Sequence, residues 1–342
     1  MKLKTLAIFS LVIGIASMAF PITSNAGNEV KPRVFINPGH GGHDSDDRPD
    51  HYYNPGVNDT VHYYESNSNI SKCASLVKIL EEKGYETAVT RVNNTTADDL
   101  DLFEIVCLAA NSGADMFFSI HSNATGIQRR MNFPLALYRG TTGNPAAPGS
   151  DSIAACIMRH AISNQATVWT RNQELSGDWT FYDWGYKVGL GVLRYNKLPG
   201  MLSEGSFHDY VPERNRLMTD DFCWLEAWNQ SLGIDEYFGR SANYGLGAVA
   251  GLVRYANVEA NDEGIKFGDD NHRPVNGAQV TLADASGRVV ATAKTDNLND
   301  GVYLFRNVTP GVYTLTVSTE GLTGNATVEV KANESAYHNF DI

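Results

Sequence analysis

Residues 33–120 alternate short apolar runs with helical patterns, and this alternation limits the folds open to the chain. Apolar runs lie at residues 34–36, 87–90 and 116–120, and helical patterns lie at about residues 69–83 and 98–112. Strands that alternate with helices form a mainly parallel sheet flanked by helices. The run MFFSI at residues 116–120 is apolar throughout, which is typical of a strand buried on both faces. We therefore predict an α/β fold here.

The pattern changes near Ser241, where helical periodicity gives way to short β runs. These runs lie at residues 278–282, 289–295, 302–305 and 312–318, separated by turns rich in Gly, Asn, Asp and Pro. Short strands at this spacing predict a small all-β sandwich. We therefore expect an α/β domain at residues 27–240 and a β-sandwich accessory domain at residues 241–342.

Residues 1–26 have the form of a secretory signal peptide. Lys2 and Lys4 precede an apolar run at residues 6–20, and small residues stand at Ser24 and Ala26. The apolar run is too short to span a bilayer comfortably. We predict cleavage after Ala26, no transmembrane segment in the mature chain, and export to the periplasm or the cell exterior.

The charge and cysteine content narrow the classes of function. The formal net charge is -12, which argues against nucleic acid as a partner because phosphates bind clustered Lys and Arg. Four widely spaced cysteines form no CxxC pair, so neither a thiolate metal site nor a redox centre is indicated. Their pairing as disulfides stays open.

An insert at about residues 125–198 interrupts the α/β pattern. It holds a Gly, Pro and Asn-rich stretch at residues 140–150, a helical piece near 153–163 and an aromatic stretch at 169–186, and it predicts no particular fold. Regular patterns return at residues 189–194, in a short strand at 201–203 and in a helix at about 220–238.

Three polar residues stand at the ends of predicted strands: His40, His121 and Glu204. Sites in open α/β sheets assemble at the carboxyl ends of strands. Two imidazoles and a carboxylate are a sufficient ligand set for a catalytic zinc, which keeps one position for water. His40 and His121 supply two ligands, and the third must come from elsewhere. Glu65 is the best candidate, because it starts the first helix within reach of the strand ends. Asn69 lies one turn further along this helix, where it can orient the Glu65 carboxylate.

Each of these signals also has an ordinary structural explanation. A single His at a strand end is more often a hydrogen-bonded structural residue, and a Glu at a helix start is usually a solvated charge favoured by the helix dipole. The joint placement of these residues at one edge of the sheet favours a metal site.

In the order in which they occur, several motifs resemble the zinc-dependent N-acetylmuramoyl-L-alanine amidases that include the cell-division and sporulation amidases. The resemblance runs over about residues 34–238. It rests on FINPGHGGHD, the pair Glu65 and Asn69, the dipeptide Thr90-Arg91, AANSGADMFFSIHSNA, and GVLRYNKLPGMLSEGSF followed by a helix ending in IDEYF. It implies one Zn²⁺ per chain, with His40, Glu65 and His121 as ligands and Glu204 as the catalytic glutamate.

The resemblance also implies a substrate and a reaction. The substrate is peptidoglycan, and the bond is the amide between the lactyl group of muramic acid and L-alanine. Zinc would activate water while Glu204 moves its proton to the leaving amine. Asn69, Arg194 and His208 are further candidates for contact with the ligands or the substrate.

Two other interpretations stay open at this point. The same metal chemistry suits a zinc peptidase acting on wall stem peptides, and a degenerate chain would be a non-catalytic wall-binding protein. The insert could carry a helix that covers the zinc until an activator protein removes it, form an aromatic wall for substrate, or serve ordinary packing. The C-terminal β runs resemble carboxypeptidase-regulatory-like or prealbumin-like domains, which implies a fold but no particular function.

Overall fold

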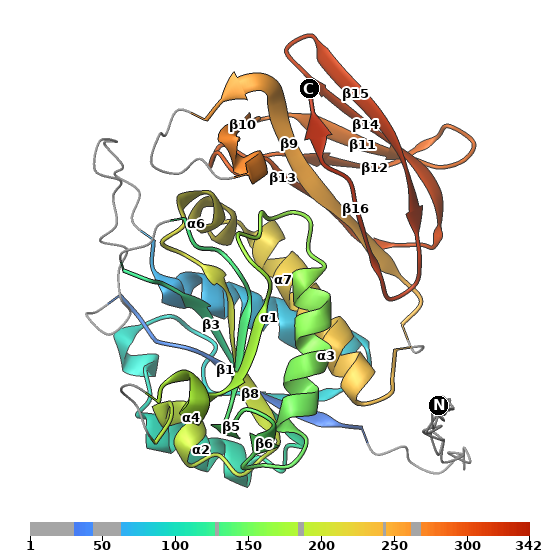
Figure 1. The fold of residues 1–342 in the computed structure, drawn as a ribbon. Coiled ribbons are helices and arrows are strands. Elements are labelled where there is room, and N and C mark those ends of the chain that lie inside the picture. Colours follow the sequence, from blue (N-terminus) through green and yellow to red (C-terminus); the bar gives the residue numbers. More distant parts are fainter. Residues whose placement is uncertain (1–30, 44–62, 127–129, 184–187, 242–243, 261–267) are drawn as a thin grey trace, which may run out of the picture. The chain divides into compact units, whose positions relative to one another are not determined.

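The computed structural model describes residues 31–43, 63–126, 130–183, 188–241, 244–260 and 268–342 (Figure 1). The predicted signal peptide lies outside these described residues. Residues 31–342 form one compact unit. The predicted division at residue 240 therefore remains a prediction.

A six-stranded sheet forms the centre of the first part of the chain, in the order β2-β1-β3-β8-β4-β7. Its strands are β1 (Arg33–Pro38), β2 (Glu86–Val89), β3 (Met116–Asn123), β4 (Leu135–Tyr138), β7 (Glu174–Gly177) and β8 (Gly200–Phe207). The neighbours of β1 and β3 run parallel to them, whereas β4 pairs antiparallel with β8 and parallel with β7. The predicted mainly parallel sheet is confirmed.

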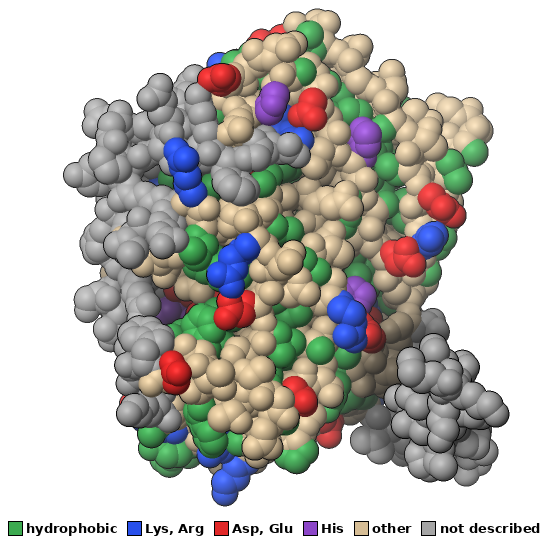
Figure 2. All heavy atoms as spheres, viewed as in Figure 1, with side chains coloured by type: hydrophobic (Ala, Val, Ile, Leu, Met, Phe, Trp, Pro, Cys, Tyr) green, Lys and Arg blue, Asp and Glu red, His purple; other side chains and the backbone are tan. Residues whose placement is uncertain are grey.

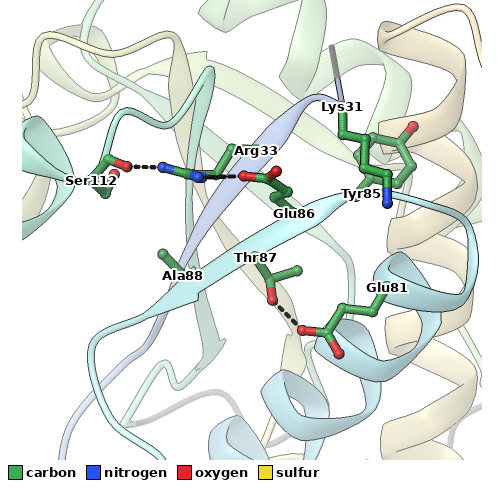
Figure 3. Close-up of a pocket in the computed structure, with 8 residues that line it drawn as sticks. All are labelled: Lys31, Arg33, Glu81, Tyr85, Glu86, Thr87, Ala88 and Ser112. Carbon is green, nitrogen blue, oxygen red and sulfur yellow. Dashed lines mark hydrogen bonds and ion pairs between the residues drawn. The ribbon is translucent and has the colours of Figure 1, made fainter. Parts of the chain in front are cut away.

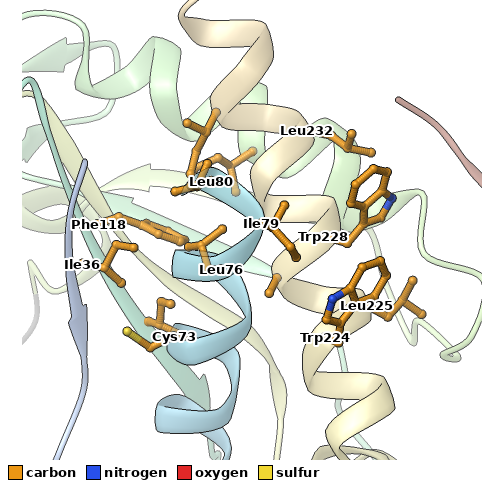
Figure 4. Packing of buried hydrophobic residues seen from close by; sticks show 14 of the residues in the cluster. Ile36, Cys73, Leu76, Ile79, Leu80, Phe118, Trp224, Leu225, Trp228 and Leu232 are labelled. Carbon is orange, nitrogen blue, oxygen red and sulfur yellow. The ribbon is translucent and has the colours of Figure 1, made fainter. Parts of the chain in front are cut away.

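Helices cover both faces of this sheet, as the alternation of its buried side chains requires. Val34 and Ile36 belong to one apolar cluster, and Phe35 between them belongs to another. The first cluster is covered by α1 (Glu65–Glu82), α3 (Ser150–Ile162) and α7 (Asp220–Tyr237), and the second by α2 (Leu102–Asn111) and α5 (Gly191–Arg194). Figure 4 shows α1 and α7 side by side over the first cluster.

The insert is built into the main sheet. It supplies β4, α3 and β7, together with the small hairpin β5 (Gly140–Thr141) and β6 (Asn144–Pro145) and the one-turn helix α4 (Asp178–Phe181). Among its described aromatic residues, Phe181 and Tyr182 pack against the second cluster, and the Trp169 indole donates a hydrogen bond to the Ile162 carbonyl. These contacts favour packing, and the substrate-wall and covering-helix interpretations stay predictions.

Several boundaries differ from the sequence prediction. The helix expected at residues 98–112 begins only at Leu102. A 3₁₀ turn, η2 (Thr96–Asp98), precedes this helix, and the Asp101 side chain caps the first turn of α2 by accepting a hydrogen bond from the Phe103 N–H. The strands β3 and β8 extend past residues 120 and 203, so His121 and Glu204 lie within strands. A short helix, α6 (Val211–Leu217), was not predicted.

The C-terminal part forms two sheets that enclose a third apolar cluster. One sheet is β12-β11-β14-β15, and the other contains β10-β9-β13 with β16 and β17 also paired to β9. The bounds are β9 (Gly247–Glu259), η3 (Gly268–Asn271), β10 (His272–Pro274), β11 (Gln279–Ala283), β12 (Val289–Lys294), β13 (Val302–Val308), β14 (Gly311–Thr319), β15 (Leu322–Val330), β16 (Ser335–Tyr337) and β17 (Phe340–Asp341). The predicted β region is confirmed.

Helix α7 is the element that joins the two parts. Every residue at positions 222–235 is buried, so the helix has no solvent face. A helix buried all round must pack against neighbours on opposite sides. Its partners are α1 and α3 on one side and β13 and β16 on the other, where the Trp228 indole donates to Ser335. The β region therefore completes the burial of α7.

The surface carries both signs of charge. On the face drawn in Figure 2, Lys and Arg side chains are scattered among Asp and Glu. None of the helices in the described part of the chain combines the length and the apolar character needed to cross a membrane.

Candidate metal centre

Three elements bring His40, Glu65 and His121 together. His40 lies in the loop after β1, Glu65 is the first residue of α1, and His121 lies near the end of β3. Their possible ligand atoms all lie within 4.8 Å of one another. The structure thus places two imidazoles and one carboxylate where they could hold a metal ion.

The loop that carries His40 has an unusual backbone that is held from several sides. His40 has a φ of 60°, a left-handed conformation that is uncommon for a residue other than glycine. At Gly39, an added Cβ atom would lie 2.0 Å from the His121 ring, so the close approach of the loop requires glycine. The Arg91 guanidinium donates to the carbonyls of Pro38 and Gly39 at 3.2 and 3.1 Å. The loop conformation is therefore fixed by packing and hydrogen bonds.

Glu65 is the central residue of the group and is buried. Its Oε1 lies 3.0 Å from His121 Nδ1 and accepts hydrogen bonds from the Ser122 backbone N–H and the Asn69 side chain, at 3.0 and 3.2 Å. Its Oε2 lies 3.2 Å from His40 Nε2. Asn69 also donates to the Gly39 carbonyl, so it links the carboxylate to the loop.

Burial and charge set the protonation of this group. Burial raises the pKa of Glu65, but the adjacent His40 and His121 outweigh burial and hold the pKa well below its usual range. Burial lowers the pKa of His121, and this exceeds the opposing effect of Glu65. Both shifts favour the carboxylate form of Glu65 and the neutral form of His121, and these are the forms that bind metal ions.

These residues fit a zinc ion in donor type and spacing. Zinc takes His nitrogen and carboxylate oxygen at about 2.0–2.2 Å in a tetrahedral arrangement, so two of its ligand atoms lie roughly 3.4 Å apart. One ligand atom from each of the three residues lies within 4.8 Å of the others, so all three can face a common point. The two short Glu65 contacts, 3.2 Å to His40 and 3.0 Å to His121, come from different carboxylate oxygens. A further position remains for water or substrate in a site with three protein ligands.

Glu204 lies beside this group on the neighbouring strand. The Cα atoms of His121 and Glu204 are direct partners in the pairing of β3 with β8. Side chains of partnered residues point to the same face of a sheet. Glu204 as a whole residue is only partly buried, although its Oε2 atom is buried.

The structure does not bring Arg194 and His208 into the ligand group. The Arg194 guanidinium donates to the Gly189 carbonyl at 3.1 Å. His208 is buried, and its ring centroid lies 5.3 Å from that of Tyr63. Substrate contact by either residue stays a prediction.

Arg91 also contributes to this site, because it holds the loop that carries His40. No role was predicted for Arg91 from the sequence. The dipeptide Thr90-Arg91 was visible as a motif, but the sequence alone gives no sign that its guanidinium reaches back to the loop after β1. Parallel pairing of β1 with β2 brings the two loops together. Thr90 takes part as well, because its hydroxyl donates to Asn37 within the same strand-end network.

A shallow pocket at the edge strand β2 is separate from this centre (Figure 3). Its lining includes Arg33, Glu81, Glu86 and Thr87, and these side chains pair with one another: Arg33 with Glu86, and Thr87 with Glu81. None of the residues that line it belongs to the metal group. This pocket is therefore distinct from the metal group.

A family model matches each part of the chain. The family model of N-acetylmuramoyl-L-alanine amidases matches residues 34–235, and that of the carboxypeptidase regulatory-like domain matches residues 268–342. The sporulation-specific N-acetylmuramoyl-L-alanine amidase of Bacillus subtilis is 25% identical over 234 residues, which cover 68% of this chain and 78% of the relative.

Solved structures of amidases also resemble part of this chain. An amidase of Clostridium difficile 630 has 25% sequence identity and a TM-score of 0.48, and the match covers 61% of this chain and 97% of that one. An amidase of Nostoc punctiforme has 22% identity and a TM-score of 0.47, with coverage of 61% and 98%. A third, from Clostridioides difficile, was solved in complex with a lipoprotein; it has 19% identity and a TM-score of 0.46, with coverage of 61% and 99%.

Proposed function

Because the chain belongs to the N-acetylmuramoyl-L-alanine amidase family, whose substrate is peptidoglycan, we propose a specific reaction and site for it. One zinc ion is bound by His40, Glu65 and His121. The bond cleaved is the amide between the lactyl group of muramic acid and L-alanine. Glu204 is the general base and then the general acid.

The observation that carries this proposal is the cluster of three possible ligand atoms within 4.8 Å of one another. The register of Glu204 with His121 on the next strand supports it. The lowered pKa values of Glu65 and His121 favour the carboxylate and the neutral imidazole, which are the forms that bind a metal cation. Asn69 and the Ser122 N–H hold the Glu65 carboxylate in one orientation, as groups around a metal ligand commonly do.

The chemistry divides between the metal and the protein. A zinc ion in this group supplies Lewis acidity, which makes water more acidic and polarises a carbonyl group. Glu204 accepts the proton of the attacking water and returns it to the nitrogen of the departing L-alanine.

The test is digestion of purified peptidoglycan with wild type and with Glu204→Gln, which keeps the shape of the side chain and removes its basicity. We expect intact glycan strands with free L-alanine amino termini from the wild type. General acid–base catalysis typically contributes about 10²–10⁴-fold to a rate, so Glu204→Gln should lower kcat by at least about 10²-fold. The variant should still bind zinc. New ends inside stem peptides would instead support the peptidase, and absence of products would support the wall-binding protein.

The metal is tested separately. Removal of zinc by a chelator should abolish activity, and addition of zinc should restore it. His121→Ala should lose the bound metal, because it removes one of three protein ligands. Retention of one zinc per chain by His121→Ala would contradict the proposed ligand set.

The location and organisation of the chain follow from the same proposal. A wall hydrolase works in the cell envelope, so we propose export by residues 1–26 with cleavage after Ala26. We also propose a catalytic domain at residues 27–240 and an accessory domain at residues 241–342. We further propose an activator protein as a partner. Adding this partner should raise the activity of the purified chain, and full activity of the chain alone would argue against it.

A further inference from the structure

Strand β8 is irregular directly after Glu204. In its pairing with β3, His121 is opposite Glu204, but Asn123 is opposite Phe207. Two steps along β3 thus match three steps along β8, so β8 contains one extra residue at Gly205 or Ser206. A bulge of this kind bends a strand and changes the direction in which the side chains next to it point. The direction of the Glu204 side chain therefore depends on what holds the bulge.

The Glu226 carboxylate of α7 lies against this bulge. A Cβ atom added at Gly205 would lie 2.1 Å from Glu226 Oε1, and its three nearest atoms all belong to that carboxyl group. Gly205 has no positive φ, so its backbone does not require glycine. A side chain at this position would therefore displace the Glu226 carboxylate.

Lys72 of α1 holds that carboxylate in place. Its side chain is fully buried, and its Nζ lies 2.9 Å from Glu226 Oε2. Gln230 donates to the other oxygen at 3.0 Å. Lys72 lies two turns after Glu65 on α1, on the same side of the helix. One face of α1 thus carries both a proposed metal ligand and the support of the bulge beside Glu204.

The burial of this ion pair is weak evidence that it was selected for stability. A buried ion pair loses the hydration of both charges, and apolar residues of similar volume are commonly as stable or more stable. The two helices already pack through a large apolar cluster (Figure 4). The Glu226 carboxylate also contacts Gly205, the residue next to Glu204 in β8, so the ion pair could act on the position of Glu204.

We propose that Lys72 and Glu226 are positioning residues: their ion pair fixes the bulge at Gly205 and so aims the Glu204 carboxylate at the metal group. This inference rests on the proposed function, because it assigns a role to residues that act through Glu204. Neither residue contacts the reacting atoms.

The experiment compares two double variants. Lys72→Met/Glu226→Gln removes the charges of this pair. Lys83→Met/Asp235→Asn removes those of a second buried pair, whose Nζ and Oδ2 lie 2.6 Å apart at the other end of α1. We expect the first variant to lower kcat by about 10-fold or more, since small misplacements of a reacting group can cost up to about 10²-fold. Its KM and zinc content should stay within twofold of wild type, and the second variant should keep all three values.

Gly205→Ala supplies an independent test if the first double variant does not fold. It keeps both charges but places a methyl group where the Glu226 carboxylate lies, so it should reproduce the loss in kcat with KM and zinc unchanged. Equal kcat in the two double variants, or wild-type kcat in Gly205→Ala, would overturn the inference. Glu204→Gln in the same assay separates the two proposals: if that variant stays active, the proposed function fails, whatever the pair variants do.

Discussion

Replacing Trp228 with alanine should destabilise the whole chain, because this side chain lies where α7, α1 and the β region meet. The Trp228 side chain is fully buried and stacks on Trp224, with ring centroids 5.5 Å apart. Its indole N–H donates to Ser335 Oγ of β16 at 3.1 Å. The Lys83 ammonium lies 4.5 Å from the centroid of its ring.

The expected loss follows from these contacts. Truncation of a buried Trp to Ala costs about 3–5 kcal/mol through lost burial and the cavity that remains. The lost hydrogen bond to Ser335 adds about 1 kcal/mol, and the lost cation–π contact adds about 1 kcal/mol. Since these contributions overlap, we expect Trp228→Ala to lower the free energy of unfolding by about 4–6 kcal/mol, a large part of the roughly 5–15 kcal/mol of a typical domain.

Urea unfolding at a fixed zinc concentration measures this loss, because bound metal itself stabilises the native state. Residues 31–342 form one compact unit, so circular dichroism and fluorescence should report one common transition for the wild type. Trp228→Phe is the matched control: it keeps most of the aromatic volume, loses the N–H, and should cost about 1–2 kcal/mol. A loss below about 2 kcal/mol for Trp228→Ala, or two separate transitions in the wild type, would refute the reasoning.

Three further predictions concern the metal group and the β region. Gly39→Ala should abolish zinc binding, measured by metal analysis, because its Cβ would lie 2.0 Å from the His121 ring; normal zinc content would show that the loop can move. Asn69→Ala should weaken zinc affinity by about 10–100-fold in a chelator competition, because Glu65 loses the donor that orients it, and unchanged affinity would remove Asn69 from the site. Burial raises the pKa of Asp300 from 3.8 to about 7, so the folded state holds this proton more tightly than the unfolded state. The stability that this proton contributes is complete below pH 3.8 and is lost as the pH rises to about 7. Asp300→Asn should therefore stabilise the fold near neutral pH by up to about 4 kcal/mol in urea unfolding, with the gain shrinking towards pH 4, and a gain independent of pH would contradict this.

Local patterns predicted the elements around the metal group well. The periodicity of α1 and the apolar runs of β1 and β3 gave the parallel sheet, and that sheet places His40 and His121 at one edge. The predicted ends were less accurate: Glu204 was expected after its strand but lies within it. Strand length depends on pairing with a neighbour, and β8 gains its last residues by pairing with β3.

The insert shows where sequence patterns stop being informative. The strand β4 has only four residues and pairs with β8 more than sixty residues further along the chain. Such a short run has no period to identify it, and long-range pairing leaves no local signal. That the insert extends the main sheet was therefore not predictable from these residues.

The sequence by itself determined the α/β class, the following β region and the residues that could bind a metal, because local periodicity and residue chemistry suffice for these. Only the tertiary structure decided that the β region covers α7, through contacts such as that of Trp228 with Ser335, 107 residues apart. Only it decided that Lys72 and Glu226 meet behind Gly205. A buried charge finds its partner through packing of distant segments, and no spacing along the chain encodes that meeting.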